Sequence, residues 1–175
     1  TVDAYMRELH PLSGVRSLGK ARVDYLIAGC GTGHQIALVV KMFDGVSVAA
    51  VDLSLTSLSY AKRKIEALGY DTVRFEQADI LELGSLNETF DVVDTTGVLH
   101  HMRDPLAGWR VLASLLRPNG LMHVALYSTA ARRHITAARA FIAANALPPT
   151  PDGIRRGRAA LAILAMGVAG SALAV

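Results

Sequence analysis

Along residues 23–127, short runs rich in apolar residues without strict alternation are interleaved with segments whose apolar residues recur every three or four positions. The first pattern is typical of parallel strands covered on both faces, and the second is typical of helices. This order predicts an α/β fold with a doubly wound, mainly parallel sheet of at least five strands and helices on both faces. The predicted strands are residues 23–28, 46–51, 73–78, 90–95 and 121–127, and the predicted helices are residues 2–9, 35–42, 55–68 and 105–116.

Local signals mark the ends of these elements. Ser54 and Asp104 are suited to cap the helices that follow them, and Gly69 suits the left-handed position after a helix. Residues 117–120 (Arg-Pro-Asn-Gly) are predicted to turn the chain into the fifth strand, and Trp109 is predicted to pack in the core. The first helix is expected to be closed by Pro11, Ser13 and Gly14.

The pattern changes after residue 128. Residues 129–175 are rich in alanine, and a proline cluster at residues 148–151 divides them into two predicted helices. The final uncharged stretch is shorter than the ~20 residues that span a bilayer, so a buried or interface helix is expected instead of a membrane anchor. We therefore divide the chain into a core domain, residues 1–128, and a helical extension, residues 129–175, which we expect to be truncated.

Composition and charge narrow the class of protein. With 51% hydrophobic and 19% charged residues, the chain has enough apolar surface for a folded core. The single cysteine excludes an internal disulfide framework, and with no recognisable signal peptide we expect a cytoplasmic protein. Residues 129–175 hold six arginines and one acid, whereas the rest is slightly acidic, so nucleic acid is not the expected partner. The arginines form either a solvated face or a contact for an anionic acceptor; the candidates are Arg132, Arg133, Arg155, Arg156 and Arg158.

Three successive predicted strands end in residues suited to bind a nucleoside. The loop Gly29-x-Gly31-x-Gly33 links a strand to a helix, where the backbone can approach an anion closely. Asp52, after the second strand, can accept hydrogen bonds from a ribose diol, although an acid before a helix also has a purely structural explanation. After the third strand, Asp79 can accept from an adenine amino group while Ile80 packs on the ring.

These segments resemble the successive motifs of class I S-adenosylmethionine-dependent methyltransferases, specifically small bacterial methyltransferase domains. The resemblance rests on the segments Leu-Ile-Ala-Gly-Cys-Gly-Thr-Gly at 26–33, Val-Asp-Leu-Ser at 51–54, Gln-Ala-Asp-Ile at 77–80, Phe-Asp-Val-Val-Asp-Thr-Thr-Gly-Val-Leu-His-His-Met-Arg-Asp-Pro at 90–105, and Arg-Pro-Asn-Gly-Leu at 117–121. It implies a Rossmann-like fold, S-adenosylmethionine as co-substrate and S-adenosylhomocysteine as product.

The resemblance also implies roles for individual residues. The glycine loop would hold the methionine part of the cofactor, Asp52 the ribose, and Asp79 with Ile80 the adenine. Residues 96–99, at the end of the fourth strand, would line the crevice beside the sulfonium. The implied cofactor-binding residues are Gly29, Cys30, Gly31, Gly33, Asp52, Leu53, Asp79, Ile80, Thr96 and Gly97. The chain departs from the family at Ile27, where an acid is usual, and no sixth and seventh closing strands are evident.

No strong catalytic constellation is visible. His100 and His101 are candidates for a general base, but consecutive side chains diverge, so a metal site is not expected. We expect methyl transfer to a small-molecule acceptor, without a membrane partner. The apolar last helix would be covered by a second copy of the chain in a homodimer, or by further domains of a longer parent chain. The alternatives are a non-catalytic domain that binds S-adenosylmethionine or a partner, and a nicotinamide-dependent oxidoreductase, which His34 at the sixth loop position disfavours.

Overall fold

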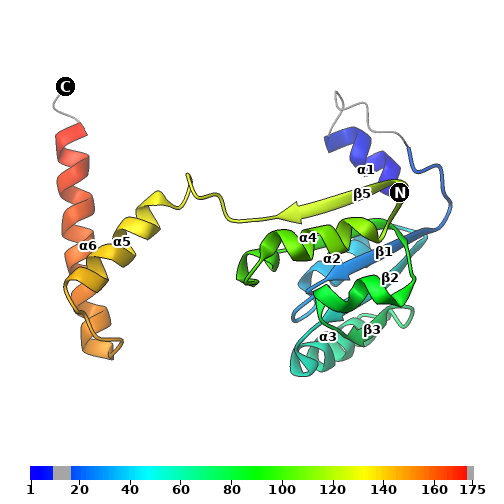
Figure 1. Cartoon of the computed structure of the whole chain (residues 1–175), viewed down its shortest axis with the longest axis horizontal. Coiled ribbons are helices and arrows are strands. Elements are labelled where there is room, and N and C mark those ends of the chain that lie inside the picture. The colour runs from blue at the N-terminus through cyan, green and yellow to red at the C-terminus, as the bar shows by residue number, and fades with distance from the viewer. Residues whose placement is uncertain (10–16, 173–175) are drawn as a thin grey trace. The chain divides into compact units, whose positions relative to one another are not determined.

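The computed structural model describes residues 1–9 and 17–172, so Pro11, Ser13 and Gly14 lie outside the described residues. The chain forms two compact units, Thr1–Leu126 and Tyr127–Val175. The first unit contains an all-parallel sheet with strand order β3-β2-β1-β4-β5 (Figure 1). Its strands are β1 (Val23–Ala28), β2 (Val46–Asp52), β3 (Arg74–Gln77), β4 (Phe90–Thr96) and β5 (Leu116–Ala125). Its helices are α1 (Val2–Leu9), α2 (His34–Met42), α3 (Leu55–Ala67) and α4 (Pro105–Ser114), with short 3-10 helices η1 (Ile80–Leu86) and η2 (Leu99–His101).

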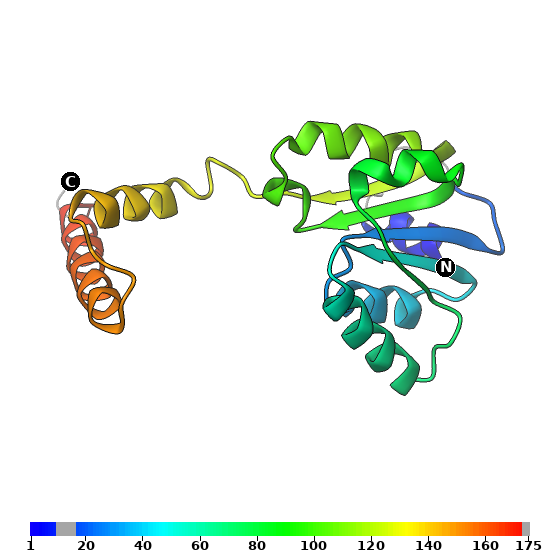
Figure 2. The same cartoon turned by 60° about the horizontal axis from the view of Figure 1, so that its bottom comes forward.

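Helices cover both faces of the sheet, as the turned view in Figure 2 shows. On one face, residues of α1, α2 and α3 pack against β1, β2 and β4 around buried Ile27, Ile36 and Ile65. On the other, η1, η2 and α4 form a second core around Leu26, Leu99 and Leu112. Alternate residues of β1 thus enter opposite cores, as a central parallel strand requires. The predicted doubly wound fold is confirmed.

Most predicted helix ends are also confirmed. The Ser54 hydroxyl accepts a hydrogen bond from the Ser57 amide, the Asp104 carboxylate accepts from the amides of residues 106 and 107, and Gly69 has a φ of 86°. Trp109 does not lie in the core as predicted: its side chain is 37% exposed. The face of α4 that is buried holds Gly108 and Leu112 instead.

The fifth strand begins earlier than the predicted residue 121. Phe90 pairs with Leu116 and Val92 with Leu121, so residues 117–120 bulge from the strand opposite Asp91. Arg117 explains the bulge, because its Nη1 donates to Asp24 Oδ2 at 2.7 Å and to Asp91 Oδ2 at 2.9 Å. The helix before it ends at Ser114, about two residues earlier than predicted.

Asp91 is the centre of a charge cluster at the amino end of the sheet. Its side chain is only 3% exposed, and it accepts hydrogen bonds from Lys20, from the Asp24 amide and from Arg117. Burial alone would raise the pKa of Asp91, but these donors outweigh it and hold the pKa below the ordinary value of 3.8. The folded state therefore gains stability from the charged form.

Asp91→Asn is expected to lower the free energy of unfolding by about 2 kcal/mol at pH 7, since two cations lose their buried partner. Because the pKa is depressed on folding, this contribution is present above pH ~4 and is lost as the pH falls through the folded-state pKa. Urea unfolding of both proteins at pH 7 and at pH 3 measures it. A difference of equal size at both pH values would contradict the electrostatic explanation.

The second unit is a pair of helices, α5 (Arg133–Ala144) and α6 (Pro151–Ala172), which confirms the two helices predicted after residue 128. The linker between the two helices includes Leu147 and Pro148. Gly153 lets the backbone of α6 approach this linker closely, because a Cβ at Gly153 would lie 2.0 Å from the Pro148 carbonyl oxygen. Among the described residues, none of the helices is long and apolar enough to cross a membrane.

Candidate functional site

The glycine loop at the carboxyl end of β1 adopts backbone angles that favour glycine. Gly29, Gly31 and Gly33 have φ values of 79°, 52° and 90°. The amides of Gly29 and Cys30 donate to the Val51 carbonyl oxygen at 2.8 and 3.0 Å, which ties the loop to β2. Gly33 begins α2 and packs against α3, since a Cβ there would lie 2.9 Å from that of Ala61. The loop is thus held between two strands and two helices.

Asp52 connects the end of β2 to this loop. One carboxylate oxygen accepts from the Gly31 amide at 2.7 Å, and the other accepts from the Ser54 amide at 2.8 Å. The side chain is half-buried and lies on the rim of a cavity. The position of Asp52 is therefore compatible with both interpretations from the sequence. It supports the start of the next helix, as a structural acid would, and it borders the cavity, as a ribose acceptor would.

Asp79 has the corresponding position at the end of β3. It caps η1 by accepting a hydrogen bond from the Leu81 amide at 2.9 Å. Between these two acids, the Gln77 side chain donates to the Leu53 carbonyl oxygen at 3.0 Å, so the ends of β2 and β3 form one continuous edge.

A cavity of about 420 Å³ lies at this edge, within the ~300–1,000 Å³ typical of small-molecule sites. It brings together six of the predicted cofactor-binding residues, namely Gly29, Asp52, Leu53, Asp79, Ile80 and Gly97. Carboxylates beside apolar side chains fit a nucleoside, which presents hydroxyl and amino donors around a flat apolar ring. The other predicted residues, Cys30, Gly31, Gly33 and Thr96, are not among the lining residues.

Four further lining residues were not predicted from the sequence, namely Ala78, Leu81, Met102 and Arg103, whereas Val98 falls within residues 96–99, which the resemblance implies at the crevice. All follow the ends of β3 and β4 and fall inside or beside the recognised motifs. Val98 shapes the wall most directly, because its methyl groups occupy the space where a side chain at Gly29 would begin.

The two histidines differ in their relation to the cavity. His101 lines it, whereas His100 is not among the lining residues, although their rings are adjacent with centroids 4.1 Å apart. Among the described residues, no group of three His, Cys, Asp or Glu side chains is arranged to hold a metal ion. A base role for either histidine stays a prediction.

Cys30 lies within the glycine loop and Ile27 precedes it on β1, and both side chains are buried. Burial, together with the nearby Asp52 carboxylate, raises the pKa of the Cys30 thiol to about 12, so it is not a nucleophile at neutral pH. Ile27, the departure from the family pattern, is buried and pairs in register with Asp94 of the neighbouring strand.

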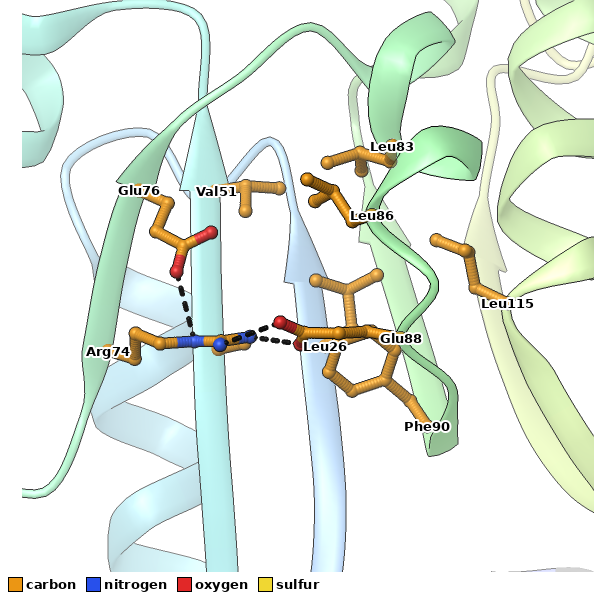
Figure 3. A pocket seen from close by; sticks show the side chains of 10 residues that line it. Leu26, Val51, Arg74, Glu76, Leu83, Leu86, Glu88, Phe90 and Leu115 are labelled. Carbon is orange, nitrogen blue, oxygen red and sulfur yellow. Dashed lines mark hydrogen bonds and ion pairs between the residues drawn. The ribbon is translucent and has the colours of Figure 1, made fainter.

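Another cavity, drawn in Figure 3, is too small for a ligand. It measures about 10 Å³ between core residues such as Leu26 and Leu83. Arg74 closes it through ion pairs with Glu76 and Glu88. This space is a packing defect of the core.

The candidate acceptor arginines belong to the second unit and make local contacts there. The Arg132 guanidinium stacks 3.9 Å from the centre of the Tyr127 ring, and Arg155 lies 3.5 Å from Asp152. A role for them, and for Arg133, Arg156 and Arg158, in binding an anionic acceptor stays a prediction.

A parallel sheet of order 3-2-1-4-5, with a glycine loop after the central strand and an acid after its neighbour, defines a Rossmann-like nucleoside-binding protein. A family model described as "Methyltransferase domain" matches residues 20–150. The chain therefore belongs to this family, and the resemblance to class I S-adenosylmethionine-dependent methyltransferases is confirmed.

Individual proteins are similar to this chain over part of their length. An uncharacterized protein of Synechococcus sp. is 34% identical over 119 residues, which are 67% of this chain and 28% of that protein. A ubiquinone biosynthesis O-methyltransferase of Rhizobium rhizogenes is 30% identical over 147 residues, 84% of this chain and 54% of the enzyme. The chain thus spans between about a quarter and a half of the length of these relatives.

Solved structures share the fold. PKMT2 from Rickettsia typhi has a TM-score of 0.75 and 21% identity, covering 92% of this chain and 31% of its own. The same protein in complex with AdoHcy has a TM-score of 0.69 and 24% identity, covering 79% of this chain and 27% of its own.

Proposed function

We propose that this chain contains the cofactor-binding part of an S-adenosylmethionine-dependent methyltransferase that acts on a small-molecule acceptor. The observation that carries the proposal is the 420 Å³ cavity, where the ends of four strands bring Gly29 of the glycine loop, two carboxylates and apolar side chains together. When bound, S-adenosylmethionine supplies an electrophilic methyl group on its sulfonium. The protein then has to orient the acceptor and exclude water.

The cavity lining supports specific roles. In this proposal Asp52 accepts from the ribose hydroxyls and Asp79 from the adenine amino group, with Leu53 and Ile80 against the ring; the support is that all four line one cavity. Gly29 and Gly97 allow the backbone to approach the methionine part of the cofactor. His101 is the histidine positioned to meet an acceptor at the same cavity. Cys30, Gly31, Gly33 and Thr96 would act indirectly, by shaping the loop and the end of β4.

Isothermal calorimetry with S-adenosylhomocysteine tests this proposal. We expect saturable binding with one site per chain, and an increase of the melting temperature that grows with ligand concentration. NAD and NADP are the controls and should leave the melting temperature unchanged. Binding of NAD in preference to S-adenosylhomocysteine, or of neither, would overturn the assignment. Binding without methyl transfer to any of a broad acceptor panel would favour the non-catalytic alternative.

A further inference from the structure

A second cavity, of about 300 Å³, lies in the first unit between the helices α1 and α2 and the strands β1, β4 and β5. Its volume is at the lower end of the range typical of small-molecule sites. Much of its wall is apolar, and it includes the rings of Tyr5 and Phe43, which contact each other edge to face with centroids 5.4 Å apart. This cavity has no lining residue in common with the proposed cofactor cavity.

The polar side chains of the second cavity gather around the carboxylate of Asp94, whose exposed fraction is 0%. Its Oδ2 accepts from the Gln35 side-chain amide at 2.8 Å and from the Tyr25 hydroxyl at 3.2 Å, and lies 3.1 Å from His123 Nδ1. Its Oδ1 accepts from the Thr96 hydroxyl at 2.9 Å. The cavity therefore combines a buried carboxylate with a largely apolar wall.

The partners of Asp94 solvate its charge, but none of them is a permanent cation. Removing a carboxylate from water is costly unless donors compensate for the lost hydration. Burial, followed by the charge of Asp94 and the hydrogen bond to it, raises the pKa of Tyr25 above its ordinary value, so its hydroxyl remains a donor. Among the described residues, no lysine or arginine lines this cavity. A cation that entered it would meet a negative potential that no permanent positive charge offsets.

The hydrogen bonds to Asp94 leave acceptor atoms for a ligand. Because a carboxylate only accepts, the proton of the neutral His123 ring lies on Nδ1, and Nε2 is left as an acceptor. The His123 side chain is 58% exposed, so this atom belongs to a ring that solvent and ligands can reach. Gln35 donates through its amide nitrogen and keeps its side-chain oxygen as an acceptor. Aromatic rings such as Tyr5 add a further attraction for cations.

We propose that the second cavity binds a small aromatic molecule that carries one protonated amine. The aromatic body packs against the apolar wall, and the ammonium group donates to His123 and Gln35 and balances the charge of Asp94. This site goes beyond the proposed function and does not depend on it. Because the two cavities are lined by different residues, the amine and S-adenosylhomocysteine are expected to bind to one chain at the same time.

Three probes of similar shape and different charge test the preference on the unmodified chain, namely phenethylamine, phenethyl alcohol and phenylpropanoate. Calorimetry is run at pH 8, above the range in which histidines ordinarily take up a proton. We expect the amine to bind about tenfold more tightly than the alcohol, and the acid to bind most weakly. Equal affinities of the amine and the alcohol would overturn the charge preference. Absence of binding by all three would overturn the site.

Methionine methyl groups report where the amine binds. Met6, Met42 and Met122 line the second cavity, whereas Met102 lines the proposed cofactor cavity. In nuclear magnetic resonance spectra of protein with isotope-labelled methionine methyl groups, phenethylamine should shift the first three signals and leave that of Met102 unchanged. A shift confined to Met102, or displacement of the amine by S-adenosylhomocysteine, would overturn the second site. Failure of S-adenosylhomocysteine to bind would instead contradict the proposed function and leave this site standing.

Two variants and a control assign the preference to particular side chains. Asp94→Asn removes the charge and keeps the shape of the side chain, so the amine should fall to the affinity of the alcohol. Asp91→Asn is the matched control, because Asp91 is a buried carboxylate of the same strand that does not line the cavity, and it should keep the preference. Retention of the preference in Asp94→Asn would overturn the role of its charge.

Leu38→Trp keeps the inference testable if Asp94→Asn does not fold. Leu38 lines the cavity from α2 and is 40% exposed, so a larger side chain there can fill the cavity without displacing the partners of Asp94. We expect Leu38→Trp to weaken the amine and the alcohol alike by tenfold or more. Unchanged binding of both probes would place them elsewhere on the protein and overturn the site.

Discussion

Replacement of Asp52 by Ala should weaken the binding of S-adenosylhomocysteine by about a hundredfold or more, because two hydrogen bonds to a charged acceptor are worth roughly 1.5–3 kcal/mol each. Part of the loss would come from the loop, since Asp52 also holds the Gly31 amide at 2.7 Å. Calorimetry measures the affinity, and circular dichroism establishes that the sheet and helices are retained. The unfolding temperature without ligand should also fall, because the Gly31 and Ser54 amides lose their acceptor.

Asp44→Ala provides the matched control, because Asp44 is an exposed acid just before β2, the strand that Asp52 ends. It should bind S-adenosylhomocysteine as the unmodified chain does. A second variant, Asp52→Asn, retains one acceptor oxygen and should fall between the two. If Asp52→Ala binds with unchanged affinity, Asp52 is a structural acid of the following helix and the ribose assignment is wrong.

Gly29→Ala should both destabilise the first unit and obstruct the cavity. The new Cβ would lie 2.3 Å from a methyl carbon of Val98, at a residue whose φ is 79°. A left-handed conformation costs a non-glycine residue about 1–2 kcal/mol, and overpacking adds roughly 1–3 kcal/mol. We expect urea unfolding to show a loss of about 3 kcal/mol, accompanied by weaker binding of S-adenosylhomocysteine.

Two further variants separate backbone strain from steric overlap. Gly31 has a φ of 52°, but no atom would lie within 4 Å of a new Cβ there. Gly31→Ala therefore measures backbone strain alone, and it should lower the free energy of unfolding by less than Gly29→Ala does. The double variant Gly29→Ala, Val98→Ala removes the nearest methyl groups and should recover part of the lost stability. Equal destabilisation by Gly29→Ala and Gly31→Ala would show that the contact with Val98 relaxes freely.

The sequence predicts those parts of the fold that are determined by residues close together along the chain. Largely apolar runs mark β1 and β2 because both faces of a central parallel strand are buried, and Gly69 marks a helix end because of its φ. The start of β5 escaped prediction because its bulge depends on Arg117 meeting Asp24, which is 93 residues away. Helical spacing placed Trp109 beside Leu112, but spacing alone does not say which of two adjacent faces is covered.

The same distinction applies to the candidate site. Asp52 and Asp79 could be found because each ends a strand, and strand ends of a parallel sheet meet at one edge. Met102 and Arg103 follow a strand through an irregular segment, where no periodicity indicates which side chains face a cavity.

The strand order also affects how the domain can form on the ribosome. The central strand β1 pairs on one side with β2, which follows soon after it in the sequence. On its other side β1 pairs with β4, so the pairing of Tyr25 with Val92 can form only after β4 has been synthesised. Such distant pairings make folding slow and leave apolar strand edges exposed in the meantime. Until β4 arrives, the β1 run and the glycine loop lack one wall. The nascent chain therefore passes through a stage in which chaperone binding would protect it, and cofactor could stabilise it only after the segment around residues 97–103 has emerged.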